Sequence, residues 1–458
     1  MEPQDLNLAI CGHAWHGKST LLGKLVAECG MATQREVEEA HAQASEGRDP
    51  SLVFAQLVFR SKDVSHGDSE AARGITILPS IVRFEFPESR VTVIDTPGQE
   101  TYANNRFFGM FQADCALLVV DAKHRVQPIT RQVIRILKGF EIPLRAVVLT
   151  KMDQVGYAEE AFLEAVAEVK QVCEEYEVDT TRAVFIPTSA YAPDRQLHEM
   201  GEGLTRFTKT PWYDGPTVRD FLRGLSFDTL RRADGPLRLA IHGSEVYDHV
   251  PGIGKTATAL VEQGTIKPDS ILLFQPLSAE RNKPVTARVR SVQLTRGHFA
   301  TPGIPLEQGV PRQLVGLAFK NLSEKDSLRE LFKGRGVIAG TVEQPPCVAQ
   351  RLLIELTVFD KDTLIHTGGA QWTMHVHVDR VPVEVTRMVE RRDANGGPWT
   401  PCSPEDPIAV GEWGRMEVTT ITRPVAIEEA ASVPPLSKLV LRLENKAVAY
   451  GRCLKILG

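Results

Sequence analysis

The sequence predicts an α/β domain with a mostly parallel sheet, followed by two antiparallel β-barrel domains. Its 458 residues exceed the roughly 250–300 residues at which a single hydrophobic core stops growing. The first half alternates apolar runs of strand length with helical patterns, which is typical of a parallel sheet covered by helices. After Gly235, short β-branched stretches are separated by glycine and proline, which is typical of antiparallel barrels.

The strands predicted in the first domain are continuous apolar runs, as expected for strands buried on both faces. They are Leu8–Cys11, Val91–Ile94, Ala116–Asp121, Arg145–Thr150 and Ala183–Pro187. Helical patterns occupy Thr130–Gly139 and Ala158–Glu175, and a further helix is expected from Lys18 to near Gly30. Residues 31–72 are polar apart from Leu52–Phe59, so they predict a surface insertion with one or two helices.

The strands predicted in the second half are shorter and alternate with turn residues. They include Pro236–Ile241, Thr256–Glu262, Ser270–Phe274, Val285–Leu294, Gln313–Asn321 and, near the end, Ala447–Ile456. A break in this pattern falls at Gly340–Pro346. We therefore expect an α/β domain over 1–228, one barrel over 236–340 and another over 344–458.

Composition bears on the partners and the cellular compartment that are expected for this protein. The net charge is −5, so any RNA contact requires a local basic patch rather than a generally basic surface. The seven cysteines form no CxxC pair, which fits a reducing compartment better than a disulfide framework. The acidic first residues have no apolar stretch of the signal-peptide kind, and no apolar run is long enough to span a bilayer. We expect a cytoplasmic protein.

The segment Gly12-His13-Ala14-Trp15-His16-Gly17-Lys18-Ser19 fits the phosphate-binding pattern G-x-x-x-x-G-K-[ST]. It follows a predicted strand and opens a predicted helix, so backbone N–H groups and the helix N-terminus can surround phosphates. Lys18 is expected to reach the β- and γ-phosphates, and Ser19 to bind Mg²⁺. The nucleotide-binding residues expected here are Gly12, His16, Gly17, Lys18, Ser19 and Thr20.

Two further motifs predict a switch that responds to the γ-phosphate. Asp95 begins Asp-Thr-Pro-Gly at the end of a predicted strand, where its carboxylate can hold Mg²⁺ through water and Gly98 can offer an N–H to the γ-phosphate. Thr76, at the end of the insertion, can complete the metal shell when that phosphate is present. The predicted metal set is Ser19, Thr76 and Asp95.

The last two motifs predict recognition of guanine. Thr150-Lys151-Met152-Asp153 ends a strand, and the Asp153 carboxylate can accept hydrogen bonds from guanine N1 and its 2-amino group. Ser189-Ala190 ends the next strand and can offer a backbone N–H to O6. Each short motif is common by chance, but all five in order at strand ends predict a P-loop GTPase with GTP/GDP and Mg²⁺ as ligands.

The pair His375 and His377 suggests a metal site, because residues i and i+2 of a strand face the same way. No third ligand stands at suitable spacing in the sequence, and we favour a structural role for both histidines.

With these motifs in hand, the whole chain resembles the translational GTPases of the elongation factor 1-alpha and elongation factor Tu group. The resemblance rests on the P-loop, Arg73–Ile77, Gln112–Ala116, Pro211–Thr217 and, in the barrels, segments such as Lys446–Gly451. It implies GTP-gated binding of aminoacyl-tRNA at the ribosome, with an exchange factor as a further partner. It also implies that Glu262 lies by the terminal adenosine of the tRNA; the alternative is a solvated acid at a strand end.

Three positions depart from the pattern of that group. Gln99 replaces its histidine, Ala14-Trp15 its Val-Asp pair, and Thr150 its asparagine. We expect Gln99, with Lys18 and Thr76, to carry hydrolysis, and the departures indicate a diverged member. Two alternatives stay open: the GTPase subunit of ATP sulfurylase, partnered by a sulfate-adenylating subunit, and a nucleotide-sensing interaction protein that hydrolyses little GTP.

Overall fold

The computed structural model describes most of the chain. The described residues are 4–45, 53–59, 76, 79–190, 200–226, 234–250, 253–276, 285–294, 303–320, 328, 336–377, 379–394, 397–403, 405–444 and 446–458. The chain divides into two compact units near Thr229. None of the helices within these described ranges is long and apolar enough to cross a membrane.

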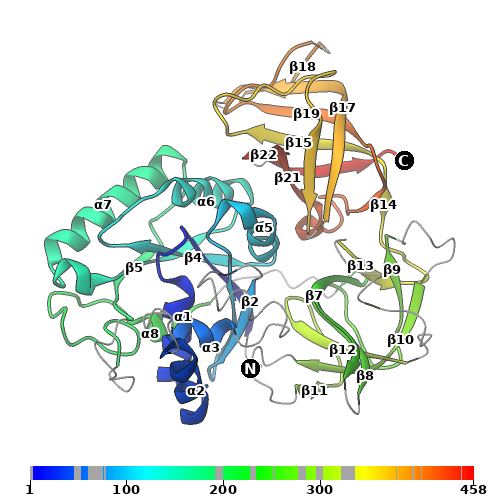
Figure 1. Cartoon of the computed structure of the whole chain (residues 1–458). Coiled ribbons are helices and arrows are strands. Elements are labelled where there is room, and N and C mark those ends of the chain that lie inside the picture. Colours follow the sequence, from blue (N-terminus) through cyan, green and yellow to red (C-terminus); the bar gives the residue numbers. More distant parts are fainter. Residues whose placement is uncertain are drawn as a thin grey trace. The chain divides into compact units, whose positions relative to one another are not determined.

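A mixed sheet forms the centre of the first unit (Figure 1). Its strand order is β2-β3-β1-β4-β5-β6, and every neighbouring pair is parallel except β2 with β3. The strands are β1 (Gln4–Gly12), β2 (Ser80–Glu85), β3 (Ser89–Asp95), β4 (Cys115–Asp121), β5 (Leu144–Thr150) and β6 (Val184–Pro187). All of β4 is buried, as expected for a central strand covered on both faces. The mostly parallel sheet is confirmed, and β2 is an element that sequence analysis did not name.

Helices cover both faces of this sheet (Figure 1). In that view α6 and α7 lie above the sheet, and α1 and α3 lie below it. The α-helices are α1 (Lys18–Glu28), α2 (Gln34–Ser45), α3 (Val53–Phe59), α5 (Ala103–Phe111), α6 (Pro128–Gly139), α7 (Glu159–Glu175) and α8 (Val218–Gly224). Short 3-10 turns follow β3 and β5, namely η2 (Glu100–Tyr102) and η3 (Met152–Val155). The apolar side chains of β1, β3, β4 and α1 share one buried cluster.

The predicted insertion contains α2 and α3, and α3 falls on its apolar stretch. Helix α3 packs closely on α1: a Cβ atom added to Gly23 would lie 1.8 Å from the backbone oxygen of Phe54. The Lys24 ammonium of α1 lies 4.3 Å from the centre of the Phe54 ring, a favourable cation–π contact. The insertion is therefore attached to the helix that begins at the phosphate loop.

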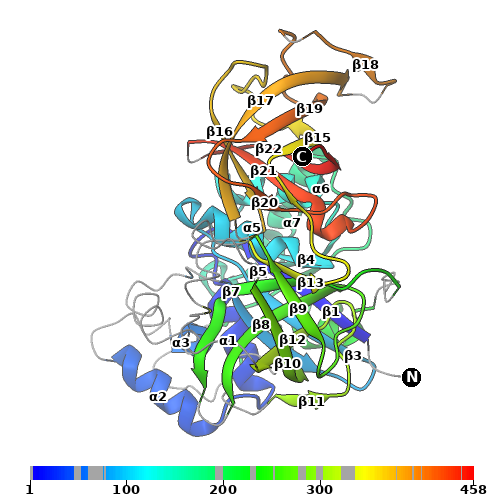
Figure 2. The same cartoon turned by 90° about the vertical axis from the view of Figure 1, so that its right-hand side faces the viewer.

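The first barrel of the second unit closes through six strands. The ring runs β10-β12-β8-β7-β13-β9 and returns to β10, with β11 added beside β10, and Figure 2 shows β7, β8 and β12 side by side. The strands are β7 (Arg238–Val250), β8 (Gly254–Gln263), β9 (Ile271–Gln275), β10 (Val285–Leu294), β11 (Ile304–Leu306), β12 (Leu314–Lys320) and β13 (Ile338–Thr341). All pairs are antiparallel.

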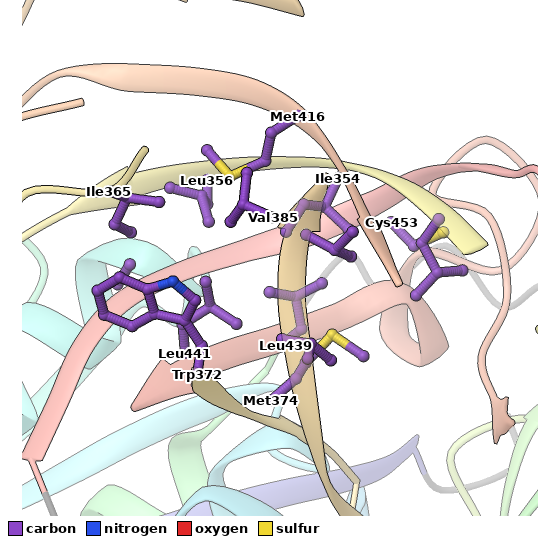
Figure 3. Close-up of a cluster of buried hydrophobic side chains, with 14 of the residues drawn as sticks. Ile354, Leu356, Ile365, Trp372, Met374, Val385, Met416, Leu439, Leu441 and Cys453 are labelled. Carbon is purple, nitrogen blue, oxygen red and sulfur yellow. The ribbon is translucent and has the colours of Figure 1, made fainter. Parts of the chain in front are cut away.

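The second barrel closes in the same manner. Its ring runs β16-β21-β22-β15-β19-β17 and returns to β16, with β18 at the edge of β17. The elements are β14 (Val348–Ala349), β15 (Arg351–Val358), β16 (Trp372–Val376), β17 (Asp379–Arg392), β18 (Thr400–Pro401), β19 (Trp413–Thr420), β20 (Val425–Ala426), η4 (Pro434–Ser437), β21 (Lys438–Leu443) and β22 (Lys446–Ile456). Figure 3 shows alternate side chains such as Ile354, Leu356 and Met416 pointing into one core. The predicted fold of an α/β domain followed by two antiparallel barrels is confirmed.

Candidate nucleotide-binding site

The phosphate loop connects β1 to α1 and has glycine at two positions of positive φ. Gly12 has φ 145° and Gly17 has φ 85°, both in the region that favours glycine. A Cβ atom at Gly12 would lie 2.3 Å from the Val119 carbonyl oxygen. Gly17 directly precedes α1, so the loop delivers the helix N-terminus to the candidate phosphate position. Thr20 lies in the first turn of that helix.

Lys18 is held within the loop. Its ammonium is buried and donates a hydrogen bond of 2.8 Å to the His13 carbonyl oxygen. Burial lowers the pKa of Lys18 to about 8, opposed by the nearby Asp95 carboxylate. A buried cation of this kind gains stability from a phosphate oxyanion, because the anion replaces the hydration that the ammonium has lost.

The segment that follows β3 closes onto the phosphate loop. The Ala14 N–H donates to the Gly98 carbonyl oxygen at 3.1 Å. A Cβ atom at Gly98 would lie 2.4 Å from the Lys18 ammonium and 2.6 Å from the Ala14 nitrogen. Gly98 therefore permits a close approach that a larger residue would block. The structure brings Lys18 and Gly98 together, as both predicted roles require.

Three oxygen ligands predicted for Mg²⁺ converge beside Lys18. The Ser19 hydroxyl donates to Asp95 Oδ2 at 2.6 Å and lies 2.7 Å from Thr76 Oγ1. The Thr76 hydroxyl is 3.3 Å from the same Asp95 oxygen. Hydroxyl and carboxylate oxygens are the hard donors that Mg²⁺ prefers, so the donor set fits this ion. When bound, Mg²⁺ would neutralise phosphate charge.

The Thr150 side chain anchors the phosphate loop to the sheet. Its hydroxyl donates to the His16 carbonyl oxygen at 2.7 Å and lies 3.3 Å from that of Val120. The His16 ring accepts from the Asp121 N–H at 3.3 Å, and burial lowers the pKa of His16 to about 3. Threonine, which replaces the asparagine expected by resemblance, thus ties β5 to the loop through one hydroxyl.

Lys151 turns the chain towards the candidate base position. It adopts φ 58°, and its ammonium contacts Asp121 Oδ2 at 2.8 Å. Burial raises the pKa of Asp121, but the hydrogen bonds from Lys151 and His124 outweigh burial, and the net pKa is below its usual value. Asp121 was not among the predicted site residues, although its position at the end of β4 could have indicated it.

Asp153 and Ser189 meet at the carboxyl ends of β5 and β6. The Ser189 hydroxyl donates to Asp153 Oδ1 at 2.5 Å. The Ser189 N–H donates to the Glu202 carbonyl oxygen at 3.0 Å, which makes Ala190 the better candidate for a bond to guanine O6. The motifs for base recognition, far apart in sequence, are therefore adjacent.

Gln99 and Trp15 directly follow Gly98 and Ala14, the two residues joined by a backbone hydrogen bond of 3.1 Å. Gln99 precedes η2 in extended conformation and is half-buried. Trp15 has φ 65°, a region that bulky residues rarely adopt, and its side chain is 57% exposed. The Asp of the resembled group tolerates this conformation better than tryptophan does. Most of the Trp15 side chain is therefore open to solvent.

Glu262 is in the second unit, at the end of β8. Its side chain is buried, and Oε2 accepts a hydrogen bond of 2.7 Å from Arg312. The alternative of a solvated strand-end acid is therefore wrong. Burial with an arginine fixes the carboxylate in one orientation.

The two histidines of the second barrel are also buried. Burial lowers the pKa of His375 to about 3 and that of His377 to about 4, so both are neutral near pH 7. Across the part of the chain that the structure describes, no group of three or more His, Cys, Asp or Glu side chains is placed to hold a metal ion. All seven cysteines are free thiols.

Comparison with known proteins agrees with this geometry. The model of the elongation factor Tu GTP binding domain matches residues 4–212. A second model, described as GTP-eEF1A C-terminal domain-like, matches residues 351–454. Elongation factor 1-alpha of Natronomonas pharaonis is 30% identical, over 98% of this chain and 97% of its own length. The chain belongs to the elongation factor 1-alpha family of translational GTPases.

Other relatives of this translational GTPase extend the likeness along the full chain. Elongation factor 1-alpha of Archaeoglobus fulgidus is 29% identical over 99% of this chain and 98% of its own length. The GTPase-like domain of S. cerevisiae Ski7 has a TM-score of 0.76 at 18% identity, covering 98% of this chain and 97% of that one. Elongation factor SelB of Methanococcus maripaludis has a TM-score of 0.65 at 16% identity, covering 100% and 80%. At these identities the two structures show the same fold.

Proposed function

We propose that this translational GTPase binds GTP with Mg²⁺ and, in that state, binds the aminoacylated end of a tRNA for delivery to the ribosome. The observation that carries the proposal is the convergence of Ser19, Thr76 and Asp95 within 3.3 Å. Thr76 lies at the end of the long insertion, and its hydroxyl completes the metal shell when the γ-phosphate is present. Full-length likeness to elongation factor 1-alpha supports tRNA as the partner.

In the proposed switch, separate groups of residues hold the phosphates and the metal. The backbone of Gly12–Gly17 and the Lys18 ammonium hold the phosphates, and Ser19, Thr76 and Asp95 hold the metal. Gly98 lies against Lys18 and Ala14, so a γ-phosphate must contact the segment that carries Gln99. Ordering of that segment and of Thr76 distinguishes GTP from GDP.

Within this proposal, Thr150, Lys151, Asp153, Ser189 and Ala190 hold the guanine. Gln99 orients the attacking water, since an amide can both donate to and accept from it.

Glu262, fixed by Arg312, contacts the terminal adenosine of the tRNA. The proposed setting is the cytoplasm, with a guanine-nucleotide exchange factor as a further partner.

The experiment measures protection of the aminoacyl ester from spontaneous hydrolysis. Aminoacyl-tRNA is incubated with the protein and either GTP or GDP, and the ester that remains is followed with time. Slower ester loss with GTP than with GDP is the expected result. Lys18→Ala is the matched control, because it removes the phosphate-binding ammonium and should abolish the protection.

Equal ester loss with both nucleotides would contradict the tRNA proposal. Pull-down of a sulfate-adenylating subunit with GTP-dependent synthesis of adenylylsulfate would then support the sulfurylase alternative. Tight GTP binding with neither activity would support a nucleotide-sensing interaction protein.

A further inference from the structure

The backbone of Glu202 pairs with the candidate guanine-binding segment. Ser189 and Glu202 form an antiparallel bridge, in which the Ser189 N–H donates to Glu202 at 3.0 Å and the Glu202 N–H donates to Ser189 at 2.9 Å. The Ser189 hydroxyl in turn donates to Asp153 at 2.5 Å. Glu202 thus contacts Ser189, and Ser189 contacts Asp153, whose carboxylate is expected to recognise the base.

The side chain of Glu202 organises the loop that follows. It is buried, and its two oxygens accept from the N–H groups of Thr208, Lys209 and Thr210 at 2.9–3.0 Å. They also accept from the hydroxyls of Thr208 at 2.8 Å and Thr210 at 2.6 Å. Burial raises the pKa of Glu202, but these hydrogen bonds outweigh it and lower the net pKa. An ionised carboxylate with this many donors holds its position firmly.

A second carboxylate also holds this segment. Glu28, at the end of α1, accepts from the Gly201 N–H at 2.5 Å and from the Thr205 hydroxyl at 2.7 Å. Helix α1 begins at Lys18, so its first turn lies at the phosphate loop and its last residue contacts this segment. Two carboxylates, those of Glu28 and Glu202, thus hold the segment 201–210.

We propose that Glu202 is a positioning residue for guanine recognition. By fixing its own backbone, Glu202 fixes Ser189 and therefore both the Asp153 carboxylate and the Ala190 N–H relative to the base. The inference rests on the proposed guanine site and adds a residue that contacts no nucleotide. The ligand class is a purine with a 6-oxygen and an N1 hydrogen.

The test compares Glu202→Gln with the exposed Glu174→Gln, which makes the same charge change on α7. The new amide would direct N–H groups at the loop N–H groups, so the loop should shift. We expect GTP affinity to fall at least about tenfold, the equivalent of one good hydrogen bond, and to stay unchanged in the control. The probe for specificity is 2-aminopurine riboside triphosphate, which lacks the 6-oxygen and the N1 hydrogen.

A positioning role predicts that Glu202→Gln weakens GTP binding more than binding of this analogue. Equal weakening of both nucleotides, or no change in either, would overturn the proposal. If the wild-type protein binds GTP tightly, the proposed guanine site stands even when the role proposed for Glu202 is rejected. If Glu202→Gln does not fold, Thr210→Val and Thr210→Ser decide: the valine should lose selectivity for GTP over the analogue, and the serine, which keeps the hydroxyl, should retain it.

Discussion

At the scale of single residues, the candidate site contains residues that sequence motifs predict and residues that only the structure identifies. Lys18, Ser19, Asp95 and Asp153 belong to the first kind. Asp121 belongs to the second, since it holds Lys151 at 2.8 Å and its N–H reaches His16. The motif residues are the ones expected to contact the ligand, whereas Asp121 contacts Lys151 and His16 and so fixes their conformations.

Asp153→Asn tests the assignment of base specificity. The amide can no longer accept both guanine N–H groups, but it complements the altered edge of xanthine. We expect weaker GTP binding, by about 1.5–3 kcal/mol for each charge-assisted hydrogen bond lost, together with improved binding of xanthosine triphosphate. Titration of the variant with each nucleotide measures both changes in affinity. Wild-type GTP affinity in the variant would show that Asp153 does not read the base.

Gln99→Ala tests the assignment of the residue that orients water. Gln99 precedes η2, close to Gly98 and the phosphate loop. We expect a large fall in single-turnover GTP hydrolysis, of about 10²-fold or more, with nearly unchanged GTP affinity. Gln171→Ala on α7 is the matched control, since it removes the same amide from an exposed position. A hydrolysis rate equal to wild type would exclude Gln99 from the chemistry.

At the scale of elements, helix α1 connects three features of the first unit. Its first turn lies at the phosphate loop, its middle packs against α3 through Gly23 and Lys24, and Glu28 holds the loop at Gly201. The insertion is therefore packed against the nucleotide-binding helix. This packing depends on the absence of a side chain at Gly23.

Gly23→Ala tests this packing. The added methyl would meet the Phe54 backbone oxygen at 1.8 Å, so α3 must move. Alanine gains about 1 kcal/mol of helix propensity, but overpacking costs typically about 1–3 kcal/mol or more, and we expect a lower thermal midpoint. Gly224→Ala, where an added Cβ meets nothing within 4 Å, is the control. A Gly23→Ala midpoint equal to or above wild type would contradict this packing.

At the scale of the whole molecule, buried charge links the two barrels of the second unit. Arg238 of β7 donates to Glu428 at 2.5 Å and to the carbonyl oxygens of Gln344 and Pro345 at 2.9 and 3.1 Å. The Cys347 N–H also donates to Glu428, at 3.2 Å. The segment between the barrels is thus held by one arginine and one glutamate, both buried.

Arg238→Met tests this link. It leaves the Glu428 carboxylate buried without its cation, a change that costs about 3–5 kcal/mol. We expect urea unfolding of the full chain to begin at a lower concentration. Arg288→Met removes a partly exposed arginine of β10 and should change the transition little. Equal effects of the two substitutions would mean that the buried pair adds no specific stability.

Four buried histidines predict the response of the molecule to acid. Burial lowers the pKa of His16, His242 and His375 to about 3 and that of His377 to about 4. Each takes up a proton near its ordinary pKa of about 6.5 only when the chain unfolds. Their contribution to stability is therefore complete above pH 6.5 and is lost as pH falls towards 3–4, by about 1.4 kcal/mol per histidine and pH unit.

Urea unfolding at pH 7.5 and pH 5.5 checks this expectation. The wild-type protein should lose stability between the two values, and His242→Gln should lose less because one titrating group is gone. The exposed His249 supplies the control, His249→Gln, which should lose as much stability between the two pH values as the wild type. An identical pH response in all three proteins would show that burial of His242 does not contribute to acid destabilisation.

Much of the fold was predictable because its signals are local. A parallel sheet buried on both faces requires uninterrupted apolar runs, and these located β1, β3, β4, β5 and β6 within a few residues. Strand β2 was missed because Ser80–Glu85 contains Arg83, whose charged side chain interrupts the apolar run. The structure pairs Arg83 with Asp5 at 2.9 Å, a contact between residues distant in sequence.

The sequence by itself determined the phosphate loop, the order of the guanine and metal motifs, and the change from an α/β pattern to barrels. These depend on backbone freedom at glycine, on strand ends and on hydrophobic periodicity, all of which act over a few residues. Tertiary structure alone decided which distant groups meet: Ser19 with Thr76 and Asp95, Glu262 with Arg312, and Glu202 with the loop behind Ser189. The physical reason is that a buried charge or hydroxyl forms hydrogen bonds with the groups that packing brings within about 3 Å. These groups can lie anywhere in the sequence, so the spacing of residues does not predict them.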